Sequence, residues 1–161
     1  MLFFVPTFAT GKQLASFILQ NIINRLNFRI MEVNNKCSVS AGEQTRRLSN
    51  RWVFDCANRL IADEGMERKC AFGQAVKAFH LLEQLGKGEV RFEYLKANGE
   101  LRKARGTLCH GISDDFDHYV YKDEDADTFT RVLRRGVYVY FDLDRRAFRT
   151  FSAKELISID V

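Results

Sequence analysis

Hydrophobic positions change their spacing near residue 88 of the chain. Before that point they recur every three to four residues, which is the spacing of an amphipathic helix. After it they alternate with polar positions, which is the spacing of a half-buried strand. The change of period predicts an α+β chain in which helices come first and strands follow.

Two helices are predicted in residues 49–86. The first can be capped by Ser49 or Asn50 and ends at 63–65, because Gly65 can take the left-handed conformation that closes many helices. The second runs from about Phe72 to Leu85 and stops at the glycines of 86–88. Neither helix can bury its apolar stripe alone, so we expect them to pack on each other and on the strands.

The helical pair also invites a DNA-binding helix-turn-helix interpretation. The second helix, however, offers few groups that could read bases or hold phosphate: Lys77, His80 and Gln74 or Gln84. This small set favours simple helix packing, with His80 on the helix surface.

Five short strands are predicted in residues 87–161. Residues 89–94 and 100–108 flank Asn98-Gly99, a strong hairpin signal because both positions tolerate a positive φ. A second turn at 143–146 joins two more strands, and a helical turn at 152–155 precedes a last strand at 156–159. Short strands and tight turns predict a small five-stranded SH3-like β-barrel with the two helices packed on it. We expect a core that includes Trp52, Phe72, Phe79, Phe92, Val139 and Phe141.

Residues 1–48 are predicted to be a leader and a polar linker. No basic stretch precedes the first apolar run, as a secretory signal requires, and that run is too short to span a bilayer. Residues 1–10 contain Pro6 and have no strand partner in the sequence, so we expect them to be loosely attached. The polar stretch from Met31 is typical of a natural amino terminus, so native translation starts at either Met1 or Met31. A chain begun at Met31 is expected to fold and melt like the full one.

Composition fits one globular domain. The chain has 161 residues, 46% hydrophobic and 29% charged, and its net charge of +4 is too mild by itself to indicate a nucleic-acid binder. The four cysteines form no CxxC pair, and Cys56 lies on an apolar stripe where a free thiol behaves as a small hydrophobe. We therefore expect reduced thiols, a cytoplasmic location, and no metal or other cofactor.

Residues 113–130 are the most acidic stretch, with seven acidic residues and one lysine. An EF-hand calcium loop needs glycine at its sixth position and glutamate at its twelfth, and neither is present, so a solvated loop is the favoured interpretation. The tempting nucleophile–base pair is Cys109-His110, but adjacent residues on a strand point to opposite faces. We therefore expect no enzyme.

Basic residues and tyrosines interleave on the predicted barrel strands. Residues 87–112 and 131–161 carry thirteen basic and seven acidic residues. If Val139 and Phe141 are core, Tyr138 and Tyr140 should point outward. Arginine neutralises phosphate and a tyrosine ring stacks on any base, so the pattern indicates a single-stranded nucleic-acid binder. The candidate face is Arg102, Arg105, Tyr140 and Arg149; the alternative is that these are ordinary outer strand positions, with Arg149 paired to Asp142 or Asp144.

The strand-rich end also resembles a known family. The segment from Val90 through Asn98-Gly99 to Leu108 is similar to the opening hairpin of the small WYL-like, Sm-like SH3 β-barrel family of Bacteroidetes, their mobile elements and phages. Residues 138–144, 147–151 and 156–159 are similar to its closing half, with Phe148 where Trp is usual and Thr150 where Ser is usual.

The resemblance covers roughly residues 52–160. It implies an SH3-like barrel and brings no catalytic residues. The namesake WYL domain of bacterial regulators is thought to sense nucleotides or nucleic acid, although this chain lacks the Trp-Tyr-Leu triplet. We expect a small accessory protein that binds nucleic acid through the candidate face; the alternative is a protein-interaction or structural module acting through the acidic loop or the helical pair.

Overall fold

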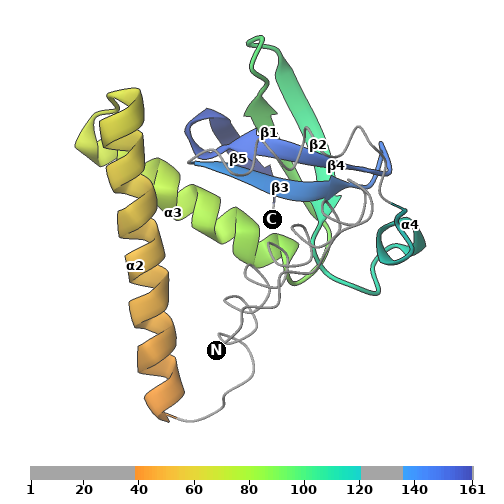
Figure 1. Cartoon of the computed structure of the whole chain (residues 1–161), viewed down its shortest axis with the longest axis horizontal. Helices are drawn as coiled ribbons and strands as arrows, with labels where there is room; N and C mark the ends of the chain where they lie inside the picture. The colour runs from red at the N-terminus through yellow and green to blue at the C-terminus, as the bar shows by residue number, and fades with distance from the viewer. Residues whose placement is uncertain (1–38, 121–135, 161) are drawn as a thin grey trace, which may run out of the picture.

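The computed structural model describes the backbone of residues 39–120 and 136–160, with side chains from Asn50 onward. Two helices precede a five-stranded antiparallel sheet (Figure 1). The helices and strands are α2 (Val39–Glu64), α3 (Arg68–Leu85), β1 (Val90–Leu95), β2 (Leu101–Thr107), β3 (Val137–Asp142), β4 (Ala147–Ser152) and β5 (Leu156–Asp160). A single helical turn, α4 (Asp114–Asp117), follows β2, and a 3-10 turn, η1 (Ala153–Glu155), joins β4 to β5. The predicted α+β order is confirmed.

Helix α2 starts at Val39 rather than at residue 49, so the predicted boundary of the polar linker is wrong. Residues 39–48 include Ala, Glu, Gln, Arg and Leu, which have high helix propensity, and they extend a helix that packing has already nucleated. The other end is as predicted: Gly65 has a φ of 63° and its amide donates to the Ile61 carbonyl at 3.1 Å. The predictions for residues 1–38 lie outside the described residues.

The two helices approach closely through small side chains. Ala71, Ala75 and Ala78 of α3 are fully buried, and Cys56, Ala57 and Leu60 of α2 are buried with them in the same core cluster. Aromatic rings flank this contact, with Trp52 and Phe79 5.5 Å apart between ring centroids. Trp52, Phe72 and Phe79, predicted to be buried, are therefore only partly buried at the rim of the core. Alanines occupy the centre because they let the helix backbones come together.

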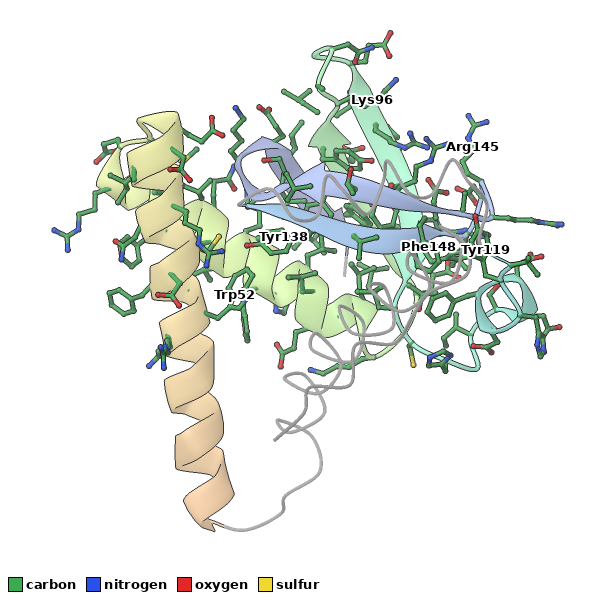
Figure 2. All side chains as sticks on the ribbon, viewed as in Figure 1. Trp52, Lys96, Tyr119, Tyr138, Arg145 and Phe148 are labelled. Atoms are coloured by element: carbon green, nitrogen blue, oxygen red, sulfur yellow. The ribbon has the colours of Figure 1, made fainter. Side chains whose placement is uncertain are left out.

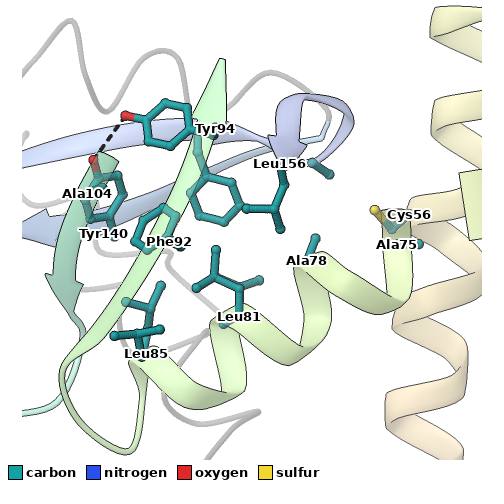
Figure 3. Packing of buried hydrophobic residues seen from close by; sticks show 14 of the residues in the cluster. Cys56, Ala75, Ala78, Leu81, Leu85, Phe92, Tyr94, Ala104, Tyr140 and Leu156 are labelled. Carbon is teal, nitrogen blue, oxygen red and sulfur yellow. Dashed lines mark hydrogen bonds between the residues drawn. The ribbon is translucent and has the colours of Figure 1, made fainter. Parts of the chain in front are cut away.

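Helix α3 fills one face of the sheet, whose strand order is β4-β3-β2-β1-β5. Leu81 and Leu85 share the core cluster with side chains from all five strands: Phe92, Tyr94, Ala104, Tyr140, Phe151 and Leu156 (Figure 3). The same helix covers the β5 edge. The Gln74 side-chain amide donates to the carbonyls of Lys154 and Leu156 at 3.1 Å each, and the Lys77 ammonium donates to the Ile157 carbonyl at 3.1 Å.

The opposite face of β3 and β4 is covered as well. Phe116 of α4 lies 5.2 Å from Phe141 and 6.0 Å from Phe148 between ring centroids, and Tyr119 contacts the same two rings (Figure 2). The buried positions predicted for Phe92, Val139 and Phe141 are confirmed.

Because β3 is covered on both faces, the prediction that Tyr140 points into solvent is wrong: its side chain is 0% exposed. Tyr138 is not an outer residue either, since its ring packs 5.4 Å from Trp52 and 5.7 Å from Phe151. Alternation identifies the two faces of a strand but does not say that only one of them is buried.

Both predicted hairpin turns are present. Gly99 has a φ of 82° and its amide donates to the Lys96 carbonyl at 2.9 Å, while Leu95 and Leu101 form the last pair. This is a longer loop with a glycine bulge rather than a two-residue turn, and Asn98 does not take a positive φ. The second turn, 143–146, follows Asp142 and includes Arg146 at a φ of 50°.

Gly106 of β2 lets the Tyr140 ring lie against the backbone, and this close approach is testable. A Cβ at position 106 would sit 2.5 Å from Tyr140 Cδ2 and 3.0 Å from the Phe141 carbonyl oxygen. We expect Gly106→Ala to lower the free energy of unfolding by about 1–3 kcal/mol, measured by urea denaturation. Gly88→Ala is the matched control, because nothing lies within 4 Å of its Cβ. Equal stability of the two variants would contradict this packing.

Candidate functional site

The structure brings three of the four predicted site residues together. Arg102 is opposite Tyr94 in the β1–β2 register, and Arg149 is opposite Tyr140 in the β3–β4 register. Side chains of directly opposed residues share a face of a sheet. Arg102, Tyr140 and Arg149 therefore lie on the face of the sheet that α3 covers, which we call the inner face. With Tyr94 and Asp142 they form what we call the barrel-end cluster. Arg105 alternates with this set and lies on the outer face.

A chain of hydrogen bonds links the buried members of the barrel-end cluster. The hydroxyls of Tyr94 and Tyr140 are 3.0 Å apart (Figure 3), and the Tyr140 hydroxyl donates to Asp142 Oδ2 at 3.5 Å. A hydroxyl has one proton, so Tyr94 must donate to Tyr140. Arg102 Nη2 donates to the same Asp142 oxygen at 3.0 Å. The series of hydrogen bonds runs from Tyr94 through Tyr140 to the Asp142 carboxylate, which also accepts from Arg102.

Asp142 holds this cluster and the turn beside it. Its side chain is 3% exposed, and its ion-pair partner Arg102 is 18% exposed. Its second oxygen, Oδ1, accepts the backbone amides of Asp144 at 3.1 Å and Arg145 at 3.0 Å. Both carboxylate oxygens are thus engaged, and Arg102 balances the buried charge. Asp142 and Tyr94 are not among the site residues predicted from the sequence. An aspartate directly before a turn is the signal that could have identified Asp142.

Burial raises the pKa of both cluster tyrosines above its ordinary value of 10.0. For Tyr94 the hydrogen bond with Tyr140 and the charges of Arg102 and Arg149 act in the opposite direction but are smaller. The two hydroxyls therefore stay protonated at neutral pH. They act as hydrogen-bonding groups and not as bases or nucleophiles.

Arg149 is the exposed member of the cluster. Among the residues that the structure describes it has no ion pair, so the predicted alternative of a pair with Asp142 or Asp144 is not observed. Its charge nevertheless acts on the Tyr94 hydroxyl. A guanidinium has five N–H donors, and Arg102 donates one of them to Asp142. Two arginines against one carboxylate leave this end of the inner face with an excess positive charge that suits an anion.

The outer face is charge-compensated instead. Arg105 Nε pairs with Asp144 Oδ1 at 3.0 Å and its Nη1 with Glu89 Oε1 at 3.3 Å. Lys103 pairs with Glu93 at 3.2 Å. A shallow hollow on this face is lined by both signs of charge: Arg91, Lys103 and Arg105 with Glu93, Asp144 and Asp160. Residues 50–120 and 136–160 contain fifteen basic and fifteen acidic residues, so the described part of the chain carries no net excess of positive charge and any excess is local.

The tempting Cys109-His110 pair has a different arrangement. The Cys109 thiol donates to the backbone carbonyl of His110 at 3.4 Å, while His110 Nδ1 lies 2.8 Å from Asp117 Oδ1. The hydrogen bond with His110 is the main reason why the pKa of Asp117 lies below its ordinary value. The His110 ring also stacks on Phe116 at 5.0 Å between centroids. The interaction of His110 with Asp117 therefore closes the loop that places Phe116 on the sheet.

Part of the acidic stretch is described. Asp115 forms an ion pair with Arg146 at 3.2 Å, which ties α4 to the β3–β4 turn. Within residues 39–120 and 136–160 no group of three or more His, Cys, Asp or Glu residues could hold a metal ion. Cys56, Cys70 and Cys109 are free thiols. No helix in the described ranges is long and apolar enough to cross a membrane.

The hydrogen-bond chain predicts a graded effect of removing hydroxyls. Tyr140→Phe takes away the middle group and leaves the buried Tyr94 hydroxyl without its acceptor, so we expect a loss of about 1–3 kcal/mol in the free energy of unfolding. Tyr94→Phe removes only the first donor and should cost less. Tyr140→Ala should cost about 3–5 kcal/mol through the cavity, rather than acting through lost base stacking. Urea denaturation measures the free energy of unfolding of all three variants. Equal losses of stability in the two Phe variants would contradict this order of hydrogen bonds.

The buried tyrosines also predict alkaline instability. Burial raises the pKa of Tyr94, Tyr138 and Tyr140 from the ordinary 10.0. As pH rises past this value, the tyrosines of the unfolded chain lose their protons before those of the folded chain. Their contribution to the free energy of unfolding is therefore fully present below about pH 10 and is lost as pH rises further. Unfolding measured over an alkaline pH series should show this fall, and Tyr138→Phe should make it shallower. The same steepness in that variant would contradict the assignment.

The comparisons with known proteins concern the barrel and the end of α3. The searches of curated proteins and of solved structures found no match. The model of a family described as WYL_2, Sm-like SH3 beta-barrel fold, matches residues 78–157. The match runs from the second half of α3 into β5 and includes every member of the barrel-end cluster. The five antiparallel strands and this match confirm the SH3-like barrel, and residues 78–157 are similar to the WYL_2 family of Sm-like SH3 β-barrels.

Proposed function

We propose that this chain is a small non-enzymatic protein that binds the phosphates of nucleic acid, single strands in preference, at the barrel-end cluster. The observation that carries the proposal is the placement of Arg149, which is exposed, lacks an ion pair within the described residues, and lies on the same face as Arg102. Arginine suits this role because its planar donors match phosphate oxygens.

The mode of binding differs from the one that the sequence suggested. Tyr140 is fully buried and Tyr94 is 4% exposed, so neither ring can stack on a base. Arg105 is engaged by two carboxylates. What remains is recognition of the backbone, which carries little sequence information. Binding should therefore be tolerant of base sequence.

Arg149 sets the scale of the interaction, because Asp142 already neutralises Arg102. Each phosphate neutralised on a single strand contributes about −0.7 to the slope of log affinity against log salt, so a slope of about −0.7 is expected. The matched family model describes a fold and no catalytic activity. A cytoplasmic accessory role in mobile elements or phages is the context that we propose from the family resemblance.

The test is a fluorescence-anisotropy titration of a labelled single-stranded oligonucleotide at several salt concentrations. Arg149→Ala should weaken binding for all sequences alike and reduce the salt slope by about 0.7, because one phosphate contact is lost. Arg91→Ala is the matched control, an exposed arginine on the outer face whose strand partner is Asp160. If the unaltered protein does not bind at low salt, or if both variants weaken binding equally, this proposal fails.

A further inference from the structure

An apolar patch lies on the outside of the helical pair. It consists of Phe54 on α2 with Phe72 and Val76 on α3, and we call it the helical patch. Phe54 is 54% exposed and Val76 is 55% exposed. The Phe54 ring meets Phe72 edge-on at 5.1 Å between centroids, and Val76 follows Phe72 by one helical turn. The other large exposed apolar residues of the described ranges lie singly on the barrel and its loops: Leu101, Ile112, Val120 and Ile157.

The contact between the helices and the barrel does not use the exposed side of this patch. On α2, Trp52 and Cys56 contact Tyr138 of the barrel, and Glu64 forms an ion pair with Lys154. Ala71, Ala75 and Ala78 of α3 are fully buried. Phe54 and Val76 thus present exposed apolar area on the outside of the helical pair. Contiguous apolar area on a folded domain marks a binding surface more often than scattered residues do.

Positive charge borders the helical patch. Arg51 precedes Phe54 by one turn, and Arg68 and Lys69 precede Phe72 by one turn; all three are exposed and make no ion pair within the described part of the chain. The positions three and four residues away from Phe54, Phe72 and Val76 contain no acidic residue. These positions are the neighbours of a residue on a helix surface. The apolar centre therefore has a basic rim.

We propose that the helical patch docks an amphipathic helix of a partner protein, whose apolar anchors are flanked by acidic residues. Apolar side chains on one helix face fit a shallow surface between two helices. Acidic flanks complement Arg51, Arg68 and Lys69, which favours encounter and orientation.

Two other occupants fit the helical patch less well. A second copy of this chain would bring the same basic rim against itself, since a two-fold contact places one patch on both sides. A lipid surface needs a continuous apolar helix face, and the helical patch has three side chains on two helices.

The test selects peptides from a random-peptide phage library on the full-length protein and measures the winning peptides by fluorescence anisotropy. We expect peptides with apolar residues at helical spacing and with Asp or Glu beside them. Phe54→Ser and, separately, Val76→Ser should each weaken the binding of these peptides at least about tenfold, as expected for a side chain that becomes buried in the complex. Leu101→Ser is the matched control, because Leu101 is 51% exposed but lies on the barrel hairpin. Thermal melting verifies that the variants fold.

Four results would overturn the proposal. They are selection of no acidic peptide, equal binding by the Phe54 and Leu101 variants, a dimer in sedimentation that Phe54→Ser dissociates, and binding to anionic phospholipid vesicles that the same substitution abolishes. Arg149→Ala separates this surface from the barrel-end cluster. It should leave peptide binding unchanged, because Arg149 lies on β4 and not on the helical pair.

Discussion

The domain depends on the burial of strand β3 on both of its faces. On the inner face Tyr140 contacts Phe92 and Phe151, and through them the layer of side chains that α3 covers. On the outer face Phe141 receives Phe116 from the single turn α4. A central strand buried in this way joins two apolar layers that would otherwise be separate. The loop after β2 is therefore part of the core, and the pair of His110 with Asp117 that closes it has a structural role.

The same strand ends at a charged group that the barrel cannot expose. Asp142 is buried, so its carboxylate requires a partner for each oxygen; the turn amides serve one and Arg102 serves the other. This requirement explains why a basic residue on β2 is drawn inward while the neighbouring Lys103 and Arg105 pair on the outer face. The basic residues of β2 thus have different roles: Arg102 neutralises a buried carboxylate, whereas Lys103 and Arg105 pair with acidic residues of the outer face.

The sequence predicted the order of elements, the end of α2 and the β1–β2 hairpin because each has a local cause: a change of period, or a glycine with a positive φ. Helix α2 was predicted too short because polar residues such as Glu43 and Gln44 carry no apolar period, although they favour helix. The burial of both Tyr140 and Phe141 could not be predicted from β3 alone, since Phe92 covers the first and Phe116 the second, and both lie elsewhere in the sequence. Of the candidate face, the register brought Arg102, Tyr140 and Arg149 together and placed Arg105 on the other side of the sheet.

The contacts of Gln74 and Lys77 with β5 have a consequence for how copies of the domain can meet. An exposed strand offers carbonyls and amides that another chain can use to extend the sheet. Here α3 side chains occupy the carbonyls of Leu156 and Ile157, so a new strand would first have to displace an amide and an ammonium group. Fibrils grow by the repeated addition of strands at sheet edges. At β5 the side chains of Gln74 and Lys77 obstruct such an addition. The helix that fills the barrel thereby also hinders the addition of a strand at the start of β5.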